Sequence, residues 1–165
     1  MLAWLLTSKL LHILCAILLV GGILGRNLTF AAARRATEVQ VIASLLELSE
    51  RFETLMVRPG SELVLLFGLL TAWLERQPLL SVLAGARPAW VFVSFVIYLL
   101  TVPLVIGLLI PAARRRRLAL AAALAQPGLT AELRAALDDR SVLVTRNVEL
   151  GIILLVIGLM VLKPF

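Results

Sequence analysis

Four long apolar stretches constrain this chain more than any other feature of its sequence. They cover residues 2–24, 57–74, 88–110 and 142–162, and each approaches the roughly 20 mostly apolar residues that a helix needs to cross a bilayer. They account for a composition that is 61% hydrophobic and only 16% charged. A soluble domain of 165 residues has too little interior to bury that much apolar surface. The sequence therefore predicts an integral membrane protein whose first partner is the lipid bilayer.

The predicted fold is an all-α bundle of four transmembrane helices with an amphipathic helical cap on the cytoplasmic side. No internal repeat and no low-complexity linker divides the chain, so we expect one four-helix transmembrane domain over residues 1–165. The first apolar stretch is too long for a signal peptide, and no basic residues precede it. We therefore expect it to be retained as the first span.

The distribution of basic residues predicts the orientation of the bundle. Ten arginines lie between the first and second spans or between the third and fourth: Arg26, Arg34, Arg35, Arg51, Arg114, Arg115, Arg116, Arg117, Arg134 and Arg140. The other side has three basic residues, Arg76, Arg87 and Lys163. The positive-inside rule then places both long connecting segments of this multi-pass protein in the cytoplasm and both termini outside. The net charge of +6 reflects this orientation, and we expect no nucleic-acid partner.

The first long connecting segment has the pattern of an amphipathic helix. Between residues 41 and 56, apolar residues that include Ile42, Leu48 and Leu55 recur at spacings of three and four, with acidic residues on much of the remaining surface. An acidic face suits anionic lipid poorly, so packing against protein is favoured. Pro59-Gly60 is expected to kink or interrupt the chain where it enters the second span.

The second long connecting segment is also predicted to be helical. The third span is expected to continue past Pro111 and through the arginine run to Gln126. Pro127-Gly128 then predicts a turn, and residues 130–140 a short helix that leads into the fourth span.

Charged residues inside spans are costly, and two spans contain them in pairs. Arg58 and Glu62 are four residues apart, and Arg146 and Glu149 are three apart, so each pair lies on one helix face. Both pairs lie near the cytoplasmic side, at a depth that allows one network across the bundle. The favoured interpretation is a structural network of ion pairs, and the alternative makes Glu62 or Glu149 a proton or cation site.

The single histidine, His12, falls near the bilayer midplane in the first span. The favoured interpretation is a neutral imidazole that hydrogen-bonds a neighbouring helix. The alternative is a haem or copper ligand, because a haem needs only one axial ligand from the protein. A copper site would combine His12 and Cys15 with Met56 or Met160. The sequence contains no set of catalytic residues, so we predict no enzymatic activity.

Several stretches together resemble an uncharacterised family of bacterial integral membrane proteins, domain of unknown function 2269. They are KLLHIL at residues 9–14 with Gly21-Gly22, SFVIYLL at 94–100 and GLMVLKP at 158–164. The resemblance implies a four-helix membrane protein and supplies no biochemical activity.

The first span is also distantly similar to the opening helix of copper-resistance D proteins and of membrane-bound protoporphyrinogen oxidases. In the oxidases a histidine at a similar position is thought to bind haem, and the resemblance extends this role to His12 alone. The tryptophan that usually follows that motif is absent, and Leu18-Leu19 stand in the region.

The leading prediction is a small, non-catalytic accessory or scaffold subunit without a cofactor. It would pack against other subunits of a larger inner-membrane complex or form a homo-oligomer. The alternative is a membrane protein that binds haem b or copper through His12, with a role in electron transfer or haem metabolism. A transporter ranks third, because four spans enclose little cavity.

Overall fold

The computed structural model describes residues 2–76, 90–126 and 128–163, and these residues form helices without any strand. In chain order the elements are α1 (Leu2–Arg35), α2 (Val39–Phe52), the π-helix η1 (Glu53–Val57), α3 (Arg58–Leu74), α4 (Trp90–Leu124), α5 (Ala131–Leu137) and α6 (Arg140–Leu162). The predicted all-α class is confirmed.

Four helical stretches are long and apolar enough to cross a membrane: 2–35, 39–74, 90–124 and 131–162. They contain the four predicted spans, except that residues 88–89 lie outside the described part of the chain. With 34 and 35 residues, α1 and α4 are each about 50 Å long, since a helix rises about 1.5 Å per residue. A hydrocarbon layer about 30 Å thick is crossed well before either helix ends.

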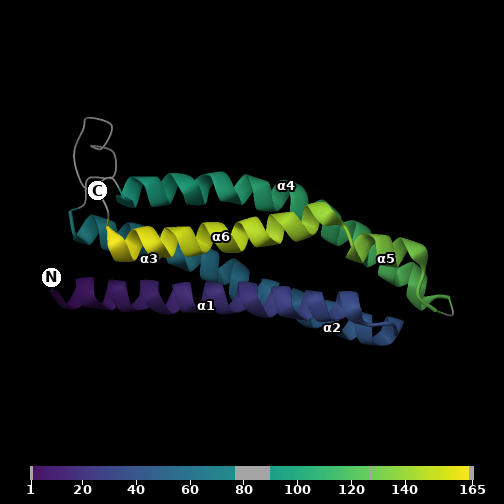
Figure 1. The fold of residues 1–165 in the computed structure, drawn as a ribbon. Coiled ribbons are helices and arrows are strands. Elements are labelled where there is room, and N and C mark those ends of the chain that lie inside the picture. Colours follow the sequence, from purple (N-terminus) through teal and green to yellow (C-terminus); the bar gives the residue numbers. More distant parts are fainter. Residues whose placement is uncertain (1, 77–89, 127, 164–165) are drawn as a thin grey trace.

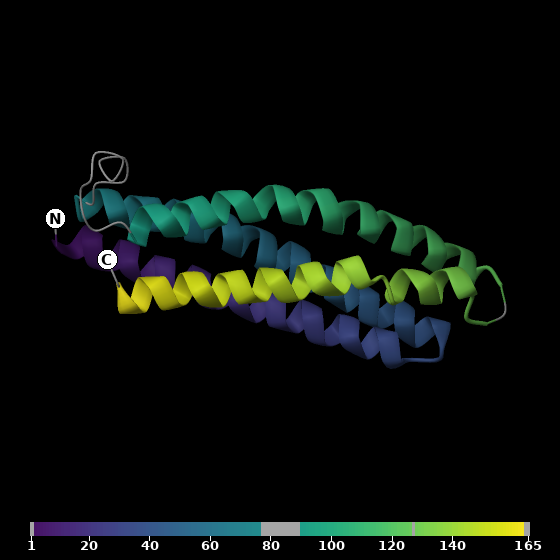
Figure 2. The same ribbon diagram turned by 45° about the horizontal axis from the view of Figure 1, so that its top comes forward.

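The helices run along one common axis, and the chain has two different ends (Figures 1 and 2). The first residues of α1 and the last residues of α6 lie at one end, which we call the terminal end. The other end holds α2, α5 and the extensions of α1 and α4, and we call it the cap. Trp4 and Trp73 are exposed at the terminal end, and the Trp90 ring lies 5.5 Å from Nζ of Lys163. A belt of tryptophans at one level is typical of a membrane boundary.

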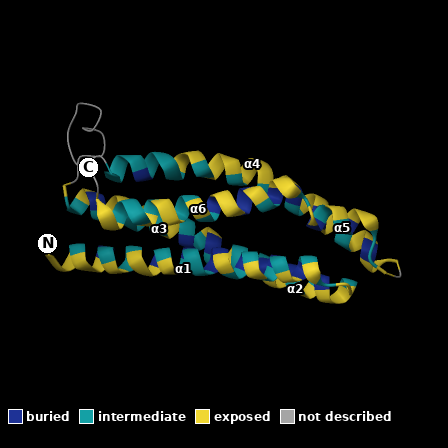
Figure 3. Cartoon of the chain, in the orientation of Figure 1, coloured by how far each residue is buried: buried dark blue, intermediate teal, exposed yellow. Residues whose placement is uncertain are grey.

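The cap contains the larger of the two hydrophobic cores. Its buried members come from α1, α2, α4, α5 and α6: Phe30, Ala33, Ile42, Leu46, Ala112, Ala123, Leu133, Leu137 and Val142. Figure 3 shows few buried residues toward the terminal end. Between 6 and 22% of the most apolar stretch of each long helix is buried. The apolar side chains of the spans are therefore free to contact lipid or other membrane proteins.

Side-chain caps explain where the cap helices begin and end. The hydroxyl of Thr130 accepts a hydrogen bond from the backbone N–H of Leu133 at the start of α5. Asp139 does the same for α6 by accepting from the N–H of Ser141. The Ser141 hydroxyl also donates to Asp139, and this bond holds the pKa of the Asp139 carboxyl below its usual value. The Arg134 guanidinium donates to the carbonyls of Arg34 and Ala36 at the end of α1.

The predicted path of α4 past Pro111 is confirmed, because α4 continues to Leu124 and its two prolines lie inside the helix. Of the predicted turn, Gly128 has φ +104°, a conformation that favours glycine, and Pro127 lies outside the described residues. The helix predicted over 130–140 is two elements, because α5 ends at Leu137 and the Asp139 cap starts a new helix.

Two expectations about the first connecting segment need correction. Pro59-Gly60 does not interrupt the chain, because α2, η1 and α3 follow one another without a gap. A proline has no N–H to donate, and the irregularity takes the form of the π-helical turn directly before it. The buried face of this segment is the predicted one only in part, because Ile42 is buried as expected. Leu46 is buried, whereas Leu48 and Leu55 are exposed.

Candidate functional site

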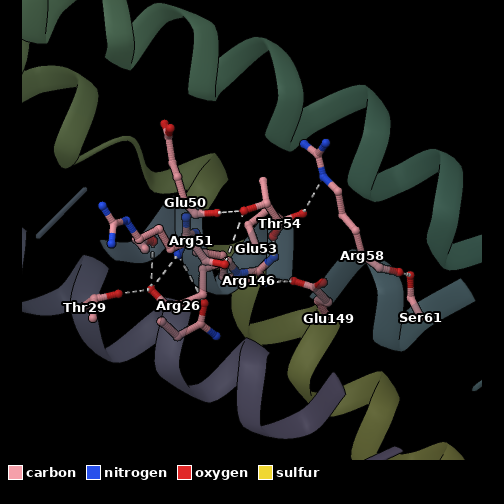
Figure 4. A network of polar contacts seen from close by, with 12 residues as sticks. Arg26, Thr29, Glu50, Arg51, Glu53, Thr54, Arg58, Ser61, Arg146 and Glu149 are labelled. Carbon is pink, nitrogen blue, oxygen red and sulfur yellow. Dashed lines mark hydrogen bonds and ion pairs between the residues drawn. The ribbon is translucent and has the colours of Figure 1, made fainter. Parts of the chain in front are cut away.

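A group of charged side chains with a buried centre joins the helices where the spans meet the cap (Figure 4). We call it the arginine–glutamate cluster; its members are Arg26, Glu53, Arg58, Arg146 and Glu149. They come from α1, η1, the start of α3, and α6. The cluster therefore links the N-terminal hairpin, formed by α1 and the continuous helices α2 to α3, to the C-terminal hairpin, formed by α4 to α6.

Arg26 is the centre of this cluster. Its side chain is only 4% exposed, and it forms ion pairs with Glu53 at 2.6 Å and with Glu149 of α6. The backbone carbonyl of Arg26 accepts hydrogen bonds from the Ser49 hydroxyl at 3.1 Å and from Nη1 of Arg146 at 3.4 Å. One residue of α1 is thus bonded to α2, η1 and α6. A buried charge is tolerated only with such partners, so these contacts specify how the helices pack.

The cluster differs from the pairing that the sequence suggested. Glu149 pairs with Arg26 instead of Arg146, and the Nε of Arg58 lies 3.7 Å from Glu53. Glu62 is exposed and forms no ion pair with any described residue. Spacings of three and four put two side chains on one helix face, but a closer partner on another helix overrides them. Arg26 is that partner for Glu149, and the π-helical turn brings Glu53 near Arg58.

Beside the cluster, two buried arginines enclose the ring of Phe30. The guanidinium carbon of Arg146 lies 4.1 Å from the ring centroid and that of Arg116 lies 4.8 Å from it. Both arginines are 7% exposed, and neither has a carboxylate within 4.0 Å among the described residues. Burial lowers the pKa of Arg116. The aromatic face supplies part of the stabilisation that carboxylates give elsewhere.

Ion pairs at the cap surface surround the cluster. Arg117 of α4 makes two bonds to Glu50 of α2, at 2.8 and 2.9 Å, and Arg34 of α1 bonds Asp138 at 2.8 Å. The hydrogen bonds that Arg117 donates to Glu50 raise the pKa of Arg117. These exposed pairs contribute little individually, but they connect the same helices as the buried ones. The arrangement is suited to holding helices together. The described carboxylates do not form a continuous proton-relay chain along the spans.

The side chain of His12, a residue of α1, packs against α3. Its Nδ1 is 2.9 Å from the carbonyl oxygen of Val64, so Nδ1 carries the proton and donates it. Gly68 provides the room for the ring, because a Cβ there would lie 3.0 Å from the imidazole Cε1. No described residue hydrogen-bonds Nε2, the nitrogen that keeps its lone pair in the neutral ring.

The copper set is only partly assembled. Cys15 is buried one turn from His12 on α1. Met56 lies against Gly21 and Gly22, nine residues or about 13 Å further along α1 from His12, so it is too distant to complete a site there. Met160 is on α6, near the terminal end. Among the described residues, no three His, Cys, Asp or Glu side chains are placed to hold a metal ion.

Glycines set the close approach of α1 to the helix opposite it. A Cβ on Gly22 would lie 2.7 Å from Cβ of Met56, and one on Gly25 would lie 2.6 Å from the Phe52 ring. A Cβ on Gly60 would lie 3.0 Å from the backbone of Leu19. This tight contact also aligns Arg26 with Glu53.

Arg26 and Glu53 are the residues of the candidate site that the sequence patterns missed. The apolar run of the first span ends at residue 24, and this placed Arg26 in a loop. A signal was present, because neither proline nor glycine interrupts the chain between Arg26 and Arg35 and the helix has no reason to stop. The pairing of Arg26 with Glu149, 123 residues away, has no local signal at all.

Taken together, the four long apolar helices and the buried charges at one end define an all-α integral membrane protein. The chain matches the family described as "Predicted integral membrane protein (DUF2269)" over residues 6–164 and belongs to that family. The predicted resemblance to this family is therefore confirmed. Searches of curated proteins and of solved structures found no match.

Proposed function

We propose that this chain is a small, non-catalytic subunit that packs against a larger membrane protein through its spans. The observation that carries the proposal is a contrast between two sets of glycines. Gly22, Gly25 and Gly60 are in close contact within the chain, whereas a Cβ on Gly107, Gly151 or Gly158 would meet no atom within 4 Å. Small residues in spans allow another helix to approach closely. The open glycines of α4 and α6 are therefore available to a partner helix.

Replacement of an open glycine tests this proposal. Gly158→Leu should release the protein from its complex with little change in its own stability, because the new side chain fills the partner's place and its Cβ would meet no atom of this chain within 4 Å. The measurement is the native mass of the affinity-tagged protein, extracted from its own membranes in mild detergent. Leu155→Ile, on an exposed part of the same helix, is the control. A wild type that migrates at the mass of one or several copies of this 18.0 kDa chain alone would contradict the proposal.

A haem-binding function is the second candidate, and the orientation of His12 favours it. A protein ligand to haem iron needs a free nitrogen, and its other nitrogen is usually fixed by a carbonyl or carboxylate. The Val64 carbonyl plays that part for Nδ1, and Nε2 has no described partner. Because His12 is the only histidine, a second axial ligand would come from another residue type, a second copy or another protein. A bound haem would supply one-electron redox chemistry.

An absorption spectrum distinguishes the two functions. If the subunit proposal holds, the purified protein is colourless and His12→Gln retains its folding and its complex, because glutamine can donate to the Val64 carbonyl as well. If haem binds, the wild type shows a Soret band that His12→Gln abolishes or shifts. A strong Soret band that depends on His12 would overturn the subunit proposal.

We further propose that the chain is one domain in a bacterial inner membrane with the cap in the cytoplasm. The cap carries the ten arginines of the connecting segments, and the positive-inside rule supports this side. Cysteine probes at Arg35 and Arg117 should resist an impermeant thiol reagent added to spheroplasts, while a probe at Ser81, outside the described residues, should react. Labelling of the two cap probes alone would reverse the orientation.

A further inference from the structure

An open cavity of about 240 Å³ lies between α1 and α6, next to the arginine–glutamate cluster. Its polar side chains are Asn27 and Arg34 from α1, and Arg146 and Asn147 from α6. Phe30, Ala31 and Leu143 form its apolar wall. The cavity is smaller than the roughly 300–1,000 Å³ of pockets for drug-sized ligands, so it suits a single small group.

The cavity presents a cation without a matching anion. Arg146 is 7% exposed, its Nε has no hydrogen-bond partner, and its Nη1 reaches only neutral oxygens, Asn27 Oδ1 at 3.2 Å and the carbonyl of Arg26. Arg34 is already paired with Asp138. The carboxylates of Glu53 and Glu149 form their ion pairs with Arg26 and not with Arg146. No described carboxylate lies within 4.0 Å of the Arg146 guanidinium, so no ion pair matches its charge.

The cavity lies at the depth of lipid headgroups. Trp4 marks the boundary at the terminal end, and Asn27 is 23 residues further along α1, or about 35 Å. The hydrocarbon layer is about 30 Å thick, so Asn27 lies close to its cap-side edge. The hydrogen bond between Asn27 and Arg146 holds Arg146 at the same level.

We propose that this cavity binds a phosphate group, namely the headgroup phosphate of an anionic phospholipid. Arginine donates charge-assisted hydrogen bonds to phosphate oxygens, and the amides of Asn27 and Asn147 add further donors. A lipid is favoured over free phosphate because the cavity opens between two membrane-spanning helices at headgroup depth. The inference is independent of the function proposed above.

A carboxylate built into the cavity tests the proposal. Asn27→Asp places a negative charge beside Arg146, where it replaces the anion. The full chain is placed in nanodiscs of phosphatidylcholine, with or without phosphatidylglycerol, and its unfolding midpoint is measured. Phosphatidylglycerol should raise the wild-type midpoint by about 2–4 °C. Asn27→Asp should have a higher midpoint than the wild type in phosphatidylcholine and should gain nothing from phosphatidylglycerol.

Gln40→Glu is the matched control, because it makes the same change of net charge on an exposed position of α2. It should respond to phosphatidylglycerol as the wild type does. Asn147→Asp, at an exposed position of the cavity, is the second variant should Asn27→Asp fail to fold, and it should also lose the response. Equal responses of the wild type and the cavity variants, or no response of the wild type, would overturn the proposal. A shift produced by inorganic phosphate in phosphatidylcholine discs would overturn lipid as the source.

Discussion

Glu149→Gln is expected to destabilise the bundle by about 3 kcal/mol, the lower end of the range for breaking a buried ion pair. Glu149 is 5% exposed and pairs with Arg26, whose own side chain is 4% exposed. The lower end applies because Arg26 keeps its second partner, Glu53. Unfolding in mixed micelles, titrated with sodium dodecyl sulfate, measures the change.

Glu62→Gln is the matched control for this variant. The substitution is the same and the residue also lies within a span, but Glu62 is exposed and pairs with no described residue. We expect little change in stability. A larger loss for Glu62→Gln than for Glu149→Gln would contradict the observed cluster and favour the Arg58–Glu62 pair that the sequence predicts.

Gly60→Leu is expected to have the second large effect. A Cβ at this position would lie 3.0 Å from the backbone of Leu19, and backbone cannot move aside as a flexible side chain can. Overpacking of this kind typically costs about 1–3 kcal/mol, and here it also pushes α1 away from the helix that carries Glu53. The same micelle titration should show the loss.

Gly151→Leu provides the comparison, because a Cβ there would meet no atom within 4 Å. It should leave the isolated chain as stable as the wild type. Equal destabilisation by the two variants would show that Gly60 is not needed for the close contact of α1 with α3.

The sequence was sufficient to predict the spans, and the reason is physical. Each span must bury its own backbone hydrogen bonds and expose apolar side chains to lipid, so the requirement acts on one contiguous stretch. The path of α4 through its arginine run could also be predicted, because no turn residues interrupt residues 112–124. Both properties are local.

The candidate site could be predicted only in part. The patterns identified Arg58, Arg146 and Glu149 as costly and correctly placed them near one end. They failed on the partners, because Arg26 and Glu149 are 123 residues apart and meet only after the two hairpins pack. The π-helical turn that brings Glu53 toward Arg58 lies directly before Pro59, and no spacing of apolar residues predicted it. For His12, the hydrogen bond to a neighbouring helix was expected, and the sequence contained no signal for its partner, Val64.

The measurement that tests the central claim most directly is a double-mutant cycle between Arg26 and Glu149. The claim is that this ion pair joins the two hairpins at the start of the cap. Arg26→Met, Glu149→Gln and the double variant are compared with the wild type by the micelle titration. We predict a coupling free energy of at least about 1.5 kcal/mol, since residues in direct contact couple by roughly 0.5–3 kcal/mol. Additive effects of the two substitutions would contradict the account.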